Sequence, residues 1–320
     1  MIIHILALDG VFDTGLATLL DAFTTANELA EMTALTSLRF DVTIVGMRKT
    51  VKTSQGLTVP VVSAPRGTVP HWMVVPAIGF KMPGPLQAAL ARKDVADAAG
   101  ALRACAEGGA DLAAACIGTF VLAESGLLDG HDATTTWWLA PFFRQRYPQV
   151  RLDESQMIVK SERIITAGAA LSHMDLALWI IRQKSPRLAA LTAKYLVVDS
   201  RPSQSAYILV DHLAHADPLV ERFERWARGE LAAGFSLEHA AAATSSSKRT
   251  LARRMQEVLG KSPLAYFQDL RVERAVHLLK TTDQTVDQIA AQVGYADGVS
   301  LRALLRRRLG HGIKEIRRII

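Results

Sequence analysis

The sequence has few cysteines, only Cys105 and Cys116 in 320 residues. Two cysteines are too few for a disulfide scaffold, and they fit a reducing compartment. We therefore expect a cytoplasmic protein. It has no apolar run long enough to span a bilayer, and its start, MIIHILALDG, lacks the basic and long apolar regions of a signal peptide. We therefore expect no membrane partner.

An excess of positive charge is missing from the first two-thirds of the chain. Residues 1–216 hold 19 Lys and Arg against 19 Asp and Glu, whereas residues 217–320 hold 18 against 12. The whole net charge of +6 therefore belongs to the last third. Such a concentration favours a phosphate backbone as partner, and the chain is long enough for two domains.

Two helix–turn–helix patterns occur in the last third. In the first, a short helix over 237–243 and a helix over 247–259 flank a polar break; in the second, helices over 286–293 and 298–309 flank Gly294 and Tyr295. A long amphipathic helix over 263–280 connects them. Each second helix carries arginines away from its apolar stripe. Solvated arginine faces are the simpler alternative, but their recurrence on two such patterns favours binding to double-stranded DNA.

From about residue 217 to 318 the chain resembles the DNA-binding domain of AraC-family transcription regulators. The matching positions are Ser-Lys-Arg-Thr-Leu-Ala-Arg-Arg at 247–254, Gly-Lys-Ser-Pro at 260–263, Tyr266, Leu270-Arg271, Arg274-Ala275, Leu278-Leu279, Ile289-Ala290, Gly294-Tyr295 and Gly310. The family usually has proline and an aromatic near its end, where this chain has Ile313 and Ile316. The resemblance implies an all-α domain and sequence-specific transcription regulation.

In such domains the first residues of each recognition helix lie nearest the base edges. The candidates in the first recognition helix are Ser247, Lys248, Arg249, Thr250 and Arg253, with Arg254 as a phosphate contact. The candidates in the second are Asp297, Gly298, Val299, Ser300 and Arg302, with Arg306 and Arg307 as phosphate contacts.

Strands and helices alternate in the first two-thirds. We expect strands at 2–8, 39–46, 57–62, 72–77, 112–115, 133–137, 157–159 and 163–166, and helices at 15–31, 86–108, 118–125, 172–182 and 188–197. Nearly continuous apolar strands indicate a mostly parallel, flavodoxin-like α/β sandwich.

The run Ala115-Cys116-Ile117-Gly118 joins a strand to a helix and has the form of a nucleophile elbow, where a helix N-terminus can lower the pKa of a cysteine. Further matching residues are Phe23, Ala26-Asn27, Leu122-Ala123, residues 126–130, Ala133-Thr134, Trp137, residues 166–168 and Asp175. Together with the run at 115–118, they resemble the PfpI-like fold of the class I glutamine-amidotransferase-like group. A PfpI-like domain followed by an AraC-type domain is the arrangement of GlxA-type regulators.

The resemblance also shows what is missing for catalysis. Enzymes of this fold commonly place His directly after the cysteine, where this chain has Ile117, and many regulators have His where it has Thr136. We therefore expect no enzyme, no cofactor and no metal, but a small-molecule effector site lined by Cys116, Ile117, Gly118, Trp137, Asp13 and Gly79. An aromatic face beside a carboxylate would suit a cationic metabolite. The alternatives are tryptophans that belong to the core, a Cys116 that is only a small buried apolar residue, and a bifunctional protein with Cys-dependent hydrolase or lyase activity.

We expect domain bounds at 1–200 for the PfpI-like domain, 201–216 for a linker and 217–320 for the AraC-type domain. The resemblance implies a homodimer. We expect the helix over 188–197 to be a dimer contact and RNA polymerase to be a further partner.

Overall fold

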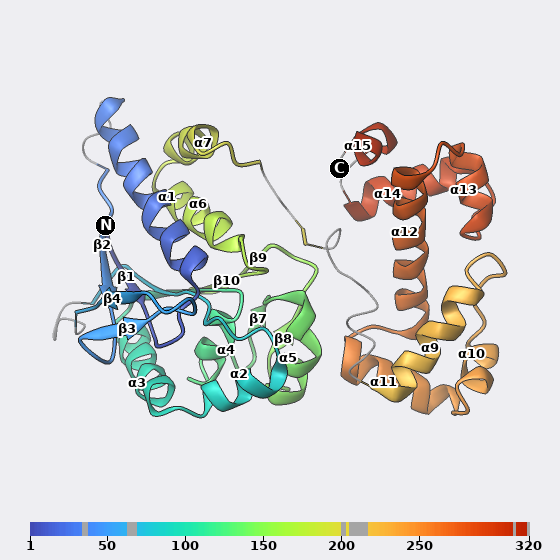
Figure 1. The fold of residues 1–320 in the computed structure, drawn as a ribbon, viewed down its shortest axis with the longest axis horizontal. Coiled ribbons are helices and arrows are strands. Elements are labelled where there is room, and N and C mark those ends of the chain that lie inside the picture. The colour runs from blue at the N-terminus through green and yellow to red at the C-terminus, as the bar shows by residue number, and fades with distance from the viewer. Residues whose placement is uncertain (34–37, 63–68, 200–202, 205–216, 310–311, 319–320) are drawn as a thin grey trace. The chain divides into compact units, whose positions relative to one another are not determined.

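The computed structural model describes residues 1–320 apart from 34–37, 63–68, 200–202, 205–216, 310–311 and 319–320 (Figure 1). The chain divides into two compact units, Met1–Leu139 with Arg146–Gln204, and Ala140–Gln145 with Ser205–Ile320. We call them the first and the second unit. The expected domain bounds stay a prediction, since most of the expected linker lies outside the described residues.

The first unit contains a six-stranded sheet in the order β2-β1-β5-β6-β10-β9. Its strands are β1 (Ile2–Leu6), β2 (Asp41–Val45), β5 (Trp72–Val75), β6 (Asp111–Ala115), β9 (Ile158–Ser161) and β10 (Ile164–Ala167). All neighbours are parallel except β9, which pairs antiparallel with β10 at the edge. Every residue of β5 and β10 is buried, as expected for a sheet covered on both faces.

Helices cover both faces of this sheet (Figure 1). On one face, α1 (Asp13–Met32), α6 (Ser172–Lys184) and α7 (Pro186–Tyr195) contact one another, and on the other α3 (Lys93–Glu107) and α4 (Gly118–Ala123) contact β6. Residues such as Leu19, Phe23 and Ile180 bury apolar side chains in one core with Ile3 and Val74 of the sheet. The predicted α/β fold is confirmed.

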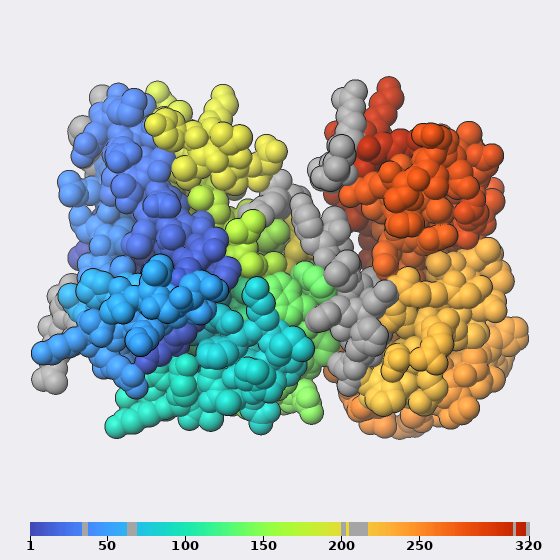
Figure 2. All heavy atoms as spheres, in the orientation of Figure 1, coloured from blue at the N-terminus to red at the C-terminus, as the bar shows by residue number. Residues whose placement is uncertain are grey.

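The remaining elements of the first unit are short. They are α2 (Pro83–Leu90), a 3-10 turn (Trp137–Leu139), the antiparallel pair β3 (Thr50–Lys52) and β4 (Thr58–Pro60), and the parallel pair β7 (Asp132–Ala133) and β8 (Arg151–Leu152). The helix α5 (Ala140–Arg146) follows the 3-10 turn, and all of it but its last residue belongs to the second unit. The helix α1 and the β3–β4 pair lie on the face of this unit that Figure 2 shows. Neither β3 nor α5 was predicted.

The helix predicted over 86–108 is two helices, α2 and α3. Arg92 adopts an extended backbone between them, with φ −70° and ψ 152°. Its guanidinium donates to the backbone oxygen of Asp9 at 2.7 Å and to both carboxylate oxygens of Asp94 at 3.0 Å. These contacts hold Arg92 outside either helix, although no proline or glycine marks the break.

The strand predicted over 133–137 is also wrong, because only Asp132 and Ala133 form a strand. The next three threonines are fully buried, and two of them bond to other elements. Thr134 N–H donates to Thr166 Oγ1 at 2.8 Å, and Thr135 Oγ1 donates to the backbone oxygen of Cys116 at 2.7 Å.

The second unit is helical. Beyond α5 it contains α9 (Pro218–Gly229), α10 (Leu237–Ala243), α11 (Lys248–Leu259), α12 (Pro263–Thr281), α13 (Val286–Gln292), α14 (Gly298–Leu309) and α15 (Ile313–Arg318). Five of these match the predicted helices within two residues, and α15 was not predicted. Ile316 of α15 is buried, so isoleucine fills the place where the family usually has an aromatic.

The long helix α12 contributes to two cores. Near its start, Tyr266 and Phe267 lie in an aromatic cluster with Phe223, Trp226 and Phe235. Farther along, residues of α12 pack with α13, α14 and α15; these are Val272, Ala275, Leu278 and Leu279. Each helix–turn–helix pattern therefore has its own core on one shared helix. Among the helices that the structure describes, none is both long and apolar enough to cross a bilayer.

Gly118→Ala should destabilise the first unit by about 2 kcal/mol or more, because a Cβ there would lie 2.2 Å from the backbone oxygen of Val75 and 2.8 Å from that of Pro76. Backbone atoms cannot move aside as a side chain can. Chemical denaturation should show the loss. The control is Gly100→Ala in α3, where the nearest atom would be 4.0 Å away; it should change stability by no more than about 1 kcal/mol. Equal effects of the two substitutions would contradict the close approach.

Candidate functional site

The start of α11 is fixed by Ser247, the residue before its first turn. Ser247 Oγ accepts from Thr250 N–H at 3.0 Å and lies 2.9 Å from Thr250 Oγ1. Both side chains are exposed, as is that of Arg249 between them. The apolar stripe of α11 (Leu251, Met255 and Leu259) is buried, so these polar residues face away from the core.

Most basic side chains of α11 have acidic partners inside the second unit. Lys248 pairs with Glu238, and Arg253 pairs with Glu257 at 2.8 Å. Arg254 pairs with Glu257 at 2.9 Å and also with Asp217. For Arg249 the described residues supply no such partner. Arg249 is therefore the side chain of this helix that is most available to a ligand.

Two aspartates fix the start of α14. Asp287 of α13 accepts from Gly298 N–H at 2.8 Å, and a Cβ on Gly298 would lie 2.6 Å from that carboxylate oxygen. Asp297 accepts from Ser300 N–H at 2.7 Å. Gly298 is buried, so it positions the helix rather than exposing a side chain. Val299 is 69% exposed beside it, an apolar side chain of the kind that contacts a thymine methyl group.

The arginines of α14 are less engaged than those of α11. Arg308 pairs with Asp269 at 3.4 Å. Arg302, Arg306 and Arg307 are exposed, and within the part of the chain that the structure describes none of them forms a salt bridge, although Arg302 interacts electrostatically with Asp297. The second unit thus displays basic side chains on both second helices, at the positions that the sequence predicted for DNA contacts.

In the first unit, Cys116 lies between β6 and α4 with φ 56°, a left-handed backbone that residues other than glycine rarely adopt. Its N–H donates to the backbone oxygen of Ala167 at 2.9 Å. The elbow predicted from the sequence is therefore present. The turn passes so close to the backbone after β5 that only glycine fits at position 118.

Although a helix N-terminus can lower the pKa of a cysteine, the pKa of Cys116 is raised. The side chain is 3% exposed, and burial raises the pKa of the thiol to about 12, while the backbone N–H of Ile117 and the charge of Lys81 lower it by less. A short helix start cannot offset the loss of water around a thiolate. At neutral pH the sulfur is a thiol.

His173, at the start of α6, is fully buried and bonded at both ring nitrogens. Ala77 N–H donates to Nε2 at 3.1 Å, so the ring must donate from Nδ1 to the backbone oxygen of Ala170 at 2.7 Å. Burial lowers the pKa of His173 to about 4. This neutral ring joins two loops and has no nitrogen left to act as a base.

Two of the expected effector-site residues share one partner. The Oδ2 atom of Asp13 accepts from Ser54 Oγ at 2.7 Å and from Gln55 N–H at 3.1 Å, and a Cβ on Gly79 would lie 2.3 Å from Ser54 Cβ. Asp13 and Gly79 follow β1 and β5, and Cys116 follows β6, the next strand of the sheet. All three therefore belong to the carboxyl edge of the sheet, where open α/β folds bind ligands.

Trp137, the aromatic residue expected at this site, is 9% exposed and packs edge-on against Trp138 at 5.6 Å. This arrangement favours the alternative that the tryptophans belong to the core. Sequence reasoning did not find Ser54, whose only signal was its position after an unpredicted strand. The described residues contain no group of histidines, cysteines and acids that could hold a metal ion.

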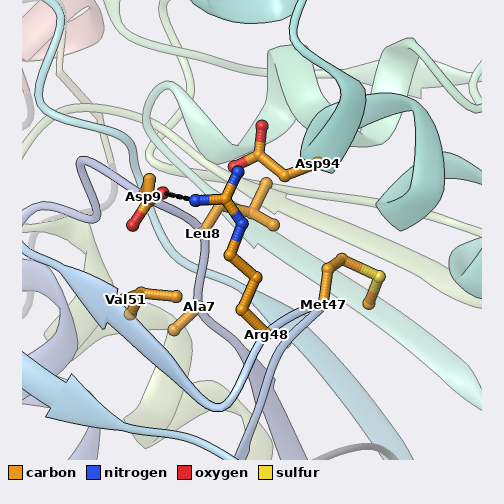
Figure 3. Close-up of a pocket in the computed structure, with 7 residues that line it drawn as sticks. All are labelled: Ala7, Leu8, Asp9, Met47, Arg48, Val51 and Asp94. Carbon is orange, nitrogen blue, oxygen red and sulfur yellow. Dashed lines mark hydrogen bonds and ion pairs between the residues drawn. The ribbon is translucent and has the colours of Figure 1, made fainter.

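A pocket lies at the end of β1, near but not at the predicted effector site (Figure 3). It encloses about 160 Å³, including solvent at its mouth, and is lined by Ala7, Leu8, Asp9, Met47, Arg48, Val51 and Asp94. Arg48 points across it to Asp9, with 2.7 Å between Nη1 and Oδ2. Ligand pockets usually enclose more than about 300 Å³, so this one is too small for a metabolite.

Comparison with known proteins assigns the second unit. Residues 240–319 match the family model of a helix-turn-helix domain. Residues 240–319 form an AraC-family helix-turn-helix domain. We call them the AraC-type domain.

Three curated relatives are HTH-type transcriptional regulators. GbdR of Pseudomonas aeruginosa is 26% identical over 198 residues, 61% of this chain and 54% of that protein. CdhR of the same species is 30% identical over 183 residues, 56% of this chain and 54% of the relative. RhaS of Enterobacter sp. is 34% identical over 109 residues, 34% of this chain and 39% of the relative. The chain thus spans about half the length of GbdR and CdhR, and less of RhaS.

Solved structures share the fold of the first unit. An AraC family transcriptional regulator from Pseudomonas putida has a TM-score of 0.51 at 18% identity, covering 61% of this chain and 98% of that one. A transcriptional regulator from Vibrio parahaemolyticus has a TM-score of 0.52 at 20% identity, with coverages of 61% and 98%. The first unit resembles the PfpI-like fold that precedes the AraC-type domain in such regulators.

His173 should make the stability of the protein depend on pH between about 6.5 and 4. In this window an unfolded chain binds a proton at the ring and the folded protein, with its pKa lowered to about 4, does not. The free energy of unfolding should therefore fall as pH falls, by on the order of 3 kcal/mol across the window. Denaturation at several pH values should show a flatter dependence for His173→Gln. The control is His71→Gln, which replaces an exposed histidine. If His173→Gln left the pH dependence of stability unchanged, the ring would not be buried as described.

Proposed function

We propose that this protein is a ligand-responsive transcription regulator that binds specific DNA sequences through its second unit. The observation that carries the proposal is the pair of recognition helices, α11 and α14, whose starts are fixed by hydrogen bonds. Each exposes basic side chains without an ion pair among the described residues, Arg249 on α11 and Arg306 and Arg307 on α14. Such helices enter the major groove with their first turns nearest the bases. The net positive charge of the last third supports phosphate contacts along the backbone.

Within this proposal, the helix starts distinguish residues that contact bases from residues that position them. Ser247, Thr250, Ser300 and the two aspartate caps hold the first turns, while Arg249, Val299 and Arg302 extend from them. Arg253 and Lys248 would exchange a surface ion pair for a DNA contact, and exposed ion pairs of this kind are weak. Arg306 and Arg307, one to two turns farther along, would contact phosphates.

The first unit is proposed as the sensor, with the effector bound at the carboxyl edge of the sheet among Cys116, Ile117, Gly118, Trp137, Asp13 and Gly79. The shared edge of β1, β5 and β6 supports this placement. The Asp13 carboxylate is ionised at neutral pH and would favour a cationic metabolite, although Ser54 and Gln55 already donate to it.

The first unit is proposed to have no catalytic activity of its own. Cys116 is a buried thiol, and His173 is a neutral ring with both nitrogens engaged. The strained backbone of Cys116 favours the alternative of a Cys-dependent hydrolase or lyase, since nucleophile elbows share it. The absence of catalysis is the simpler proposal, because catalysis would require Cys116 and His173 to leave their observed surroundings.

The proposed oligomeric state, partner and cellular compartment follow from the proposed role as a transcription regulator. A homodimer would present two second units to a symmetric site. The helix α7 is the proposed contact, through its exposed residue Tyr195 and the following Val197, because Leu188, Ala189 and Thr192 are buried within the unit. RNA polymerase is a proposed partner, and the cytoplasm the proposed compartment.

Arg249→Ala should relax sequence choice, whereas Arg306→Ala should weaken binding to all duplexes alike. Loss of a base contact costs about 1–3 kcal/mol of binding free energy on the preferred duplex and little on others. Loss of a phosphate contact weakens binding to every duplex and also reduces the slope of log affinity against log salt concentration by about one. Titrations with a duplex selected from a random pool, and with its scrambled version, measure both. Arg182→Ala in the first unit, an equal change of charge, should have neither effect. Equal losses on both duplexes for both substitutions would contradict the division of roles.

Cys116→Ser should leave DNA binding within about twofold of the natural protein, because the side chain lies in the first unit and the substitution is nearly isosteric. Hydrolysis of small esters and amides by the natural protein should not exceed that of the variant. Turnover by the natural protein that Cys116→Ser abolishes would instead establish the bifunctional alternative.

A further inference from the structure

Arg271, in the middle of α12, contacts both helix–turn–helix halves of the second unit. We call α9–α11 the first half and α13–α15 the second half, with α12 between them. The Arg271 guanidinium donates twice to the backbone oxygen of Leu231 in the first half, from Nε at 3.0 Å and from Nη2 at 2.9 Å. Its Cζ lies 5.4 Å from the ring centroid of Tyr295 in the second half. One side chain thus bridges the two halves.

The turn between α13 and α14 lies directly against this guanidinium. Gly294, in that turn, has φ 76°, and a Cβ there would collide with Arg271 Nη2 and with the backbone oxygen of Leu231. Phe267, one turn earlier on α12, also faces the guanidinium, with 4.9 Å between Cζ and its ring centroid. Two aromatic rings and one carbonyl oxygen therefore hold the charged group in place.

Asp269 makes a second connection between the halves, from the other side of α12. Residues two apart on an α-helix are separated by about 200° around its axis. Asp269 Oδ2 accepts from Nζ of Lys261, which follows α11 in the first half, at 2.9 Å. Its other oxygen, Oδ1, pairs with Arg308 of α14 at 3.4 Å. The Asp269 side chain is only 20% exposed, so water screens these ion pairs less than pairs on an open surface.

We propose that Arg271 and Asp269 form a joint that fixes the orientation of α14 relative to α11, and thereby sets the spacing between the two DNA segments that the protein reads. This inference rests on the proposed function, in which both helices bind one duplex. Arg271 acts at the start of α14, through the turn that precedes it, and Asp269 acts near its end, through Arg308. Both are positioning residues, because they hold the helix rather than contact the bases.

A duplex with one extra base pair between the two segments measures this joint. The insertion moves one segment by about 3.4 Å along the axis and rotates it by about 35°. A rigid joint cannot follow that displacement, so one recognition helix must lose base contacts. A looser joint follows it with a smaller loss. We define the spacing ratio as Kd on the lengthened duplex divided by Kd on the original duplex.

Titrations of the full chain test the joint, with a duplex selected from a random pool and a series that carries one extra base pair at each successive position. For the natural protein, the largest spacing ratio in the series should be at least about ten, the loss expected for one base contact. Arg271→Met and Asp269→Asn should each lower that ratio to about three or less.

Two matched controls remove the same charges from exposed positions. They are Arg274→Met on α12 and Asp283→Asn in the loop after it, and both should keep the spacing ratio of the natural protein. A substitution that only reduces the amount of folded protein weakens binding to both duplexes by the same factor. It leaves the ratio unchanged, so instability cannot imitate the expected result.

An unchanged spacing ratio in either Arg271→Met or Asp269→Asn overturns the joint. So does a natural protein that tolerates an extra base pair at every position of the selected duplex. Failure of the natural protein to select any duplex from the pool overturns the proposed function instead.

Discussion

The first unit depends on the close approach of the turn after β6 to the backbone after β5. Gly118 is the residue that permits it, since any side chain would meet the carbonyl oxygens of Val75 and Pro76. The turn forces Cys116 into a left-handed backbone and places its sulfur in the core. Burial then raises the pKa of the thiol. One steric constraint thus accounts for both the elbow shape of this turn and the burial of the thiol.

The second unit follows a different constraint, the sharing of one helix by two small cores. Because α12 packs with α9–α11 at one end and with α13–α15 at the other, neither helix–turn–helix pattern needs a large core of its own. The starts of the recognition helices are then set by polar contacts, from Ser247 in α11 and from Asp297 and Asp287 in α14. Each of these hydrogen bonds holds a first turn in position without the need for a large buried apolar surface.

The sequence predicted features that depend on contacts between neighbouring residues, and it missed features that depend on contacts between residues far apart in the sequence. The bounds of α10, α11 and α14 were predicted within one residue, because caps and apolar stripes lie within the helices themselves. The break at Arg92 was missed because its partner, the backbone of Asp9, is 83 residues away. Thr134 and Thr135 were assigned to a strand, yet they bond to residues distant in the sequence. The burial of the Gln204 side chain was missed for the same reason, with hydrogen-bond partners 48 to 70 residues away.

Pairing of charges separates the two recognition helices. On α11, Lys248, Arg253 and Arg254 are neutralised by nearby acids, whereas on α14 only Arg308 has such a partner among the described residues. If the protein binds DNA as proposed, release of counterions should therefore come mainly from α14 and from Arg249, whereas Lys248, Arg253 and Arg254 of α11 must exchange their partners to contribute. In the proposed complex with DNA, Asp217 would compete with phosphate for Arg254. A signal that broke this one ion pair would then alter α11 without acting directly on α14.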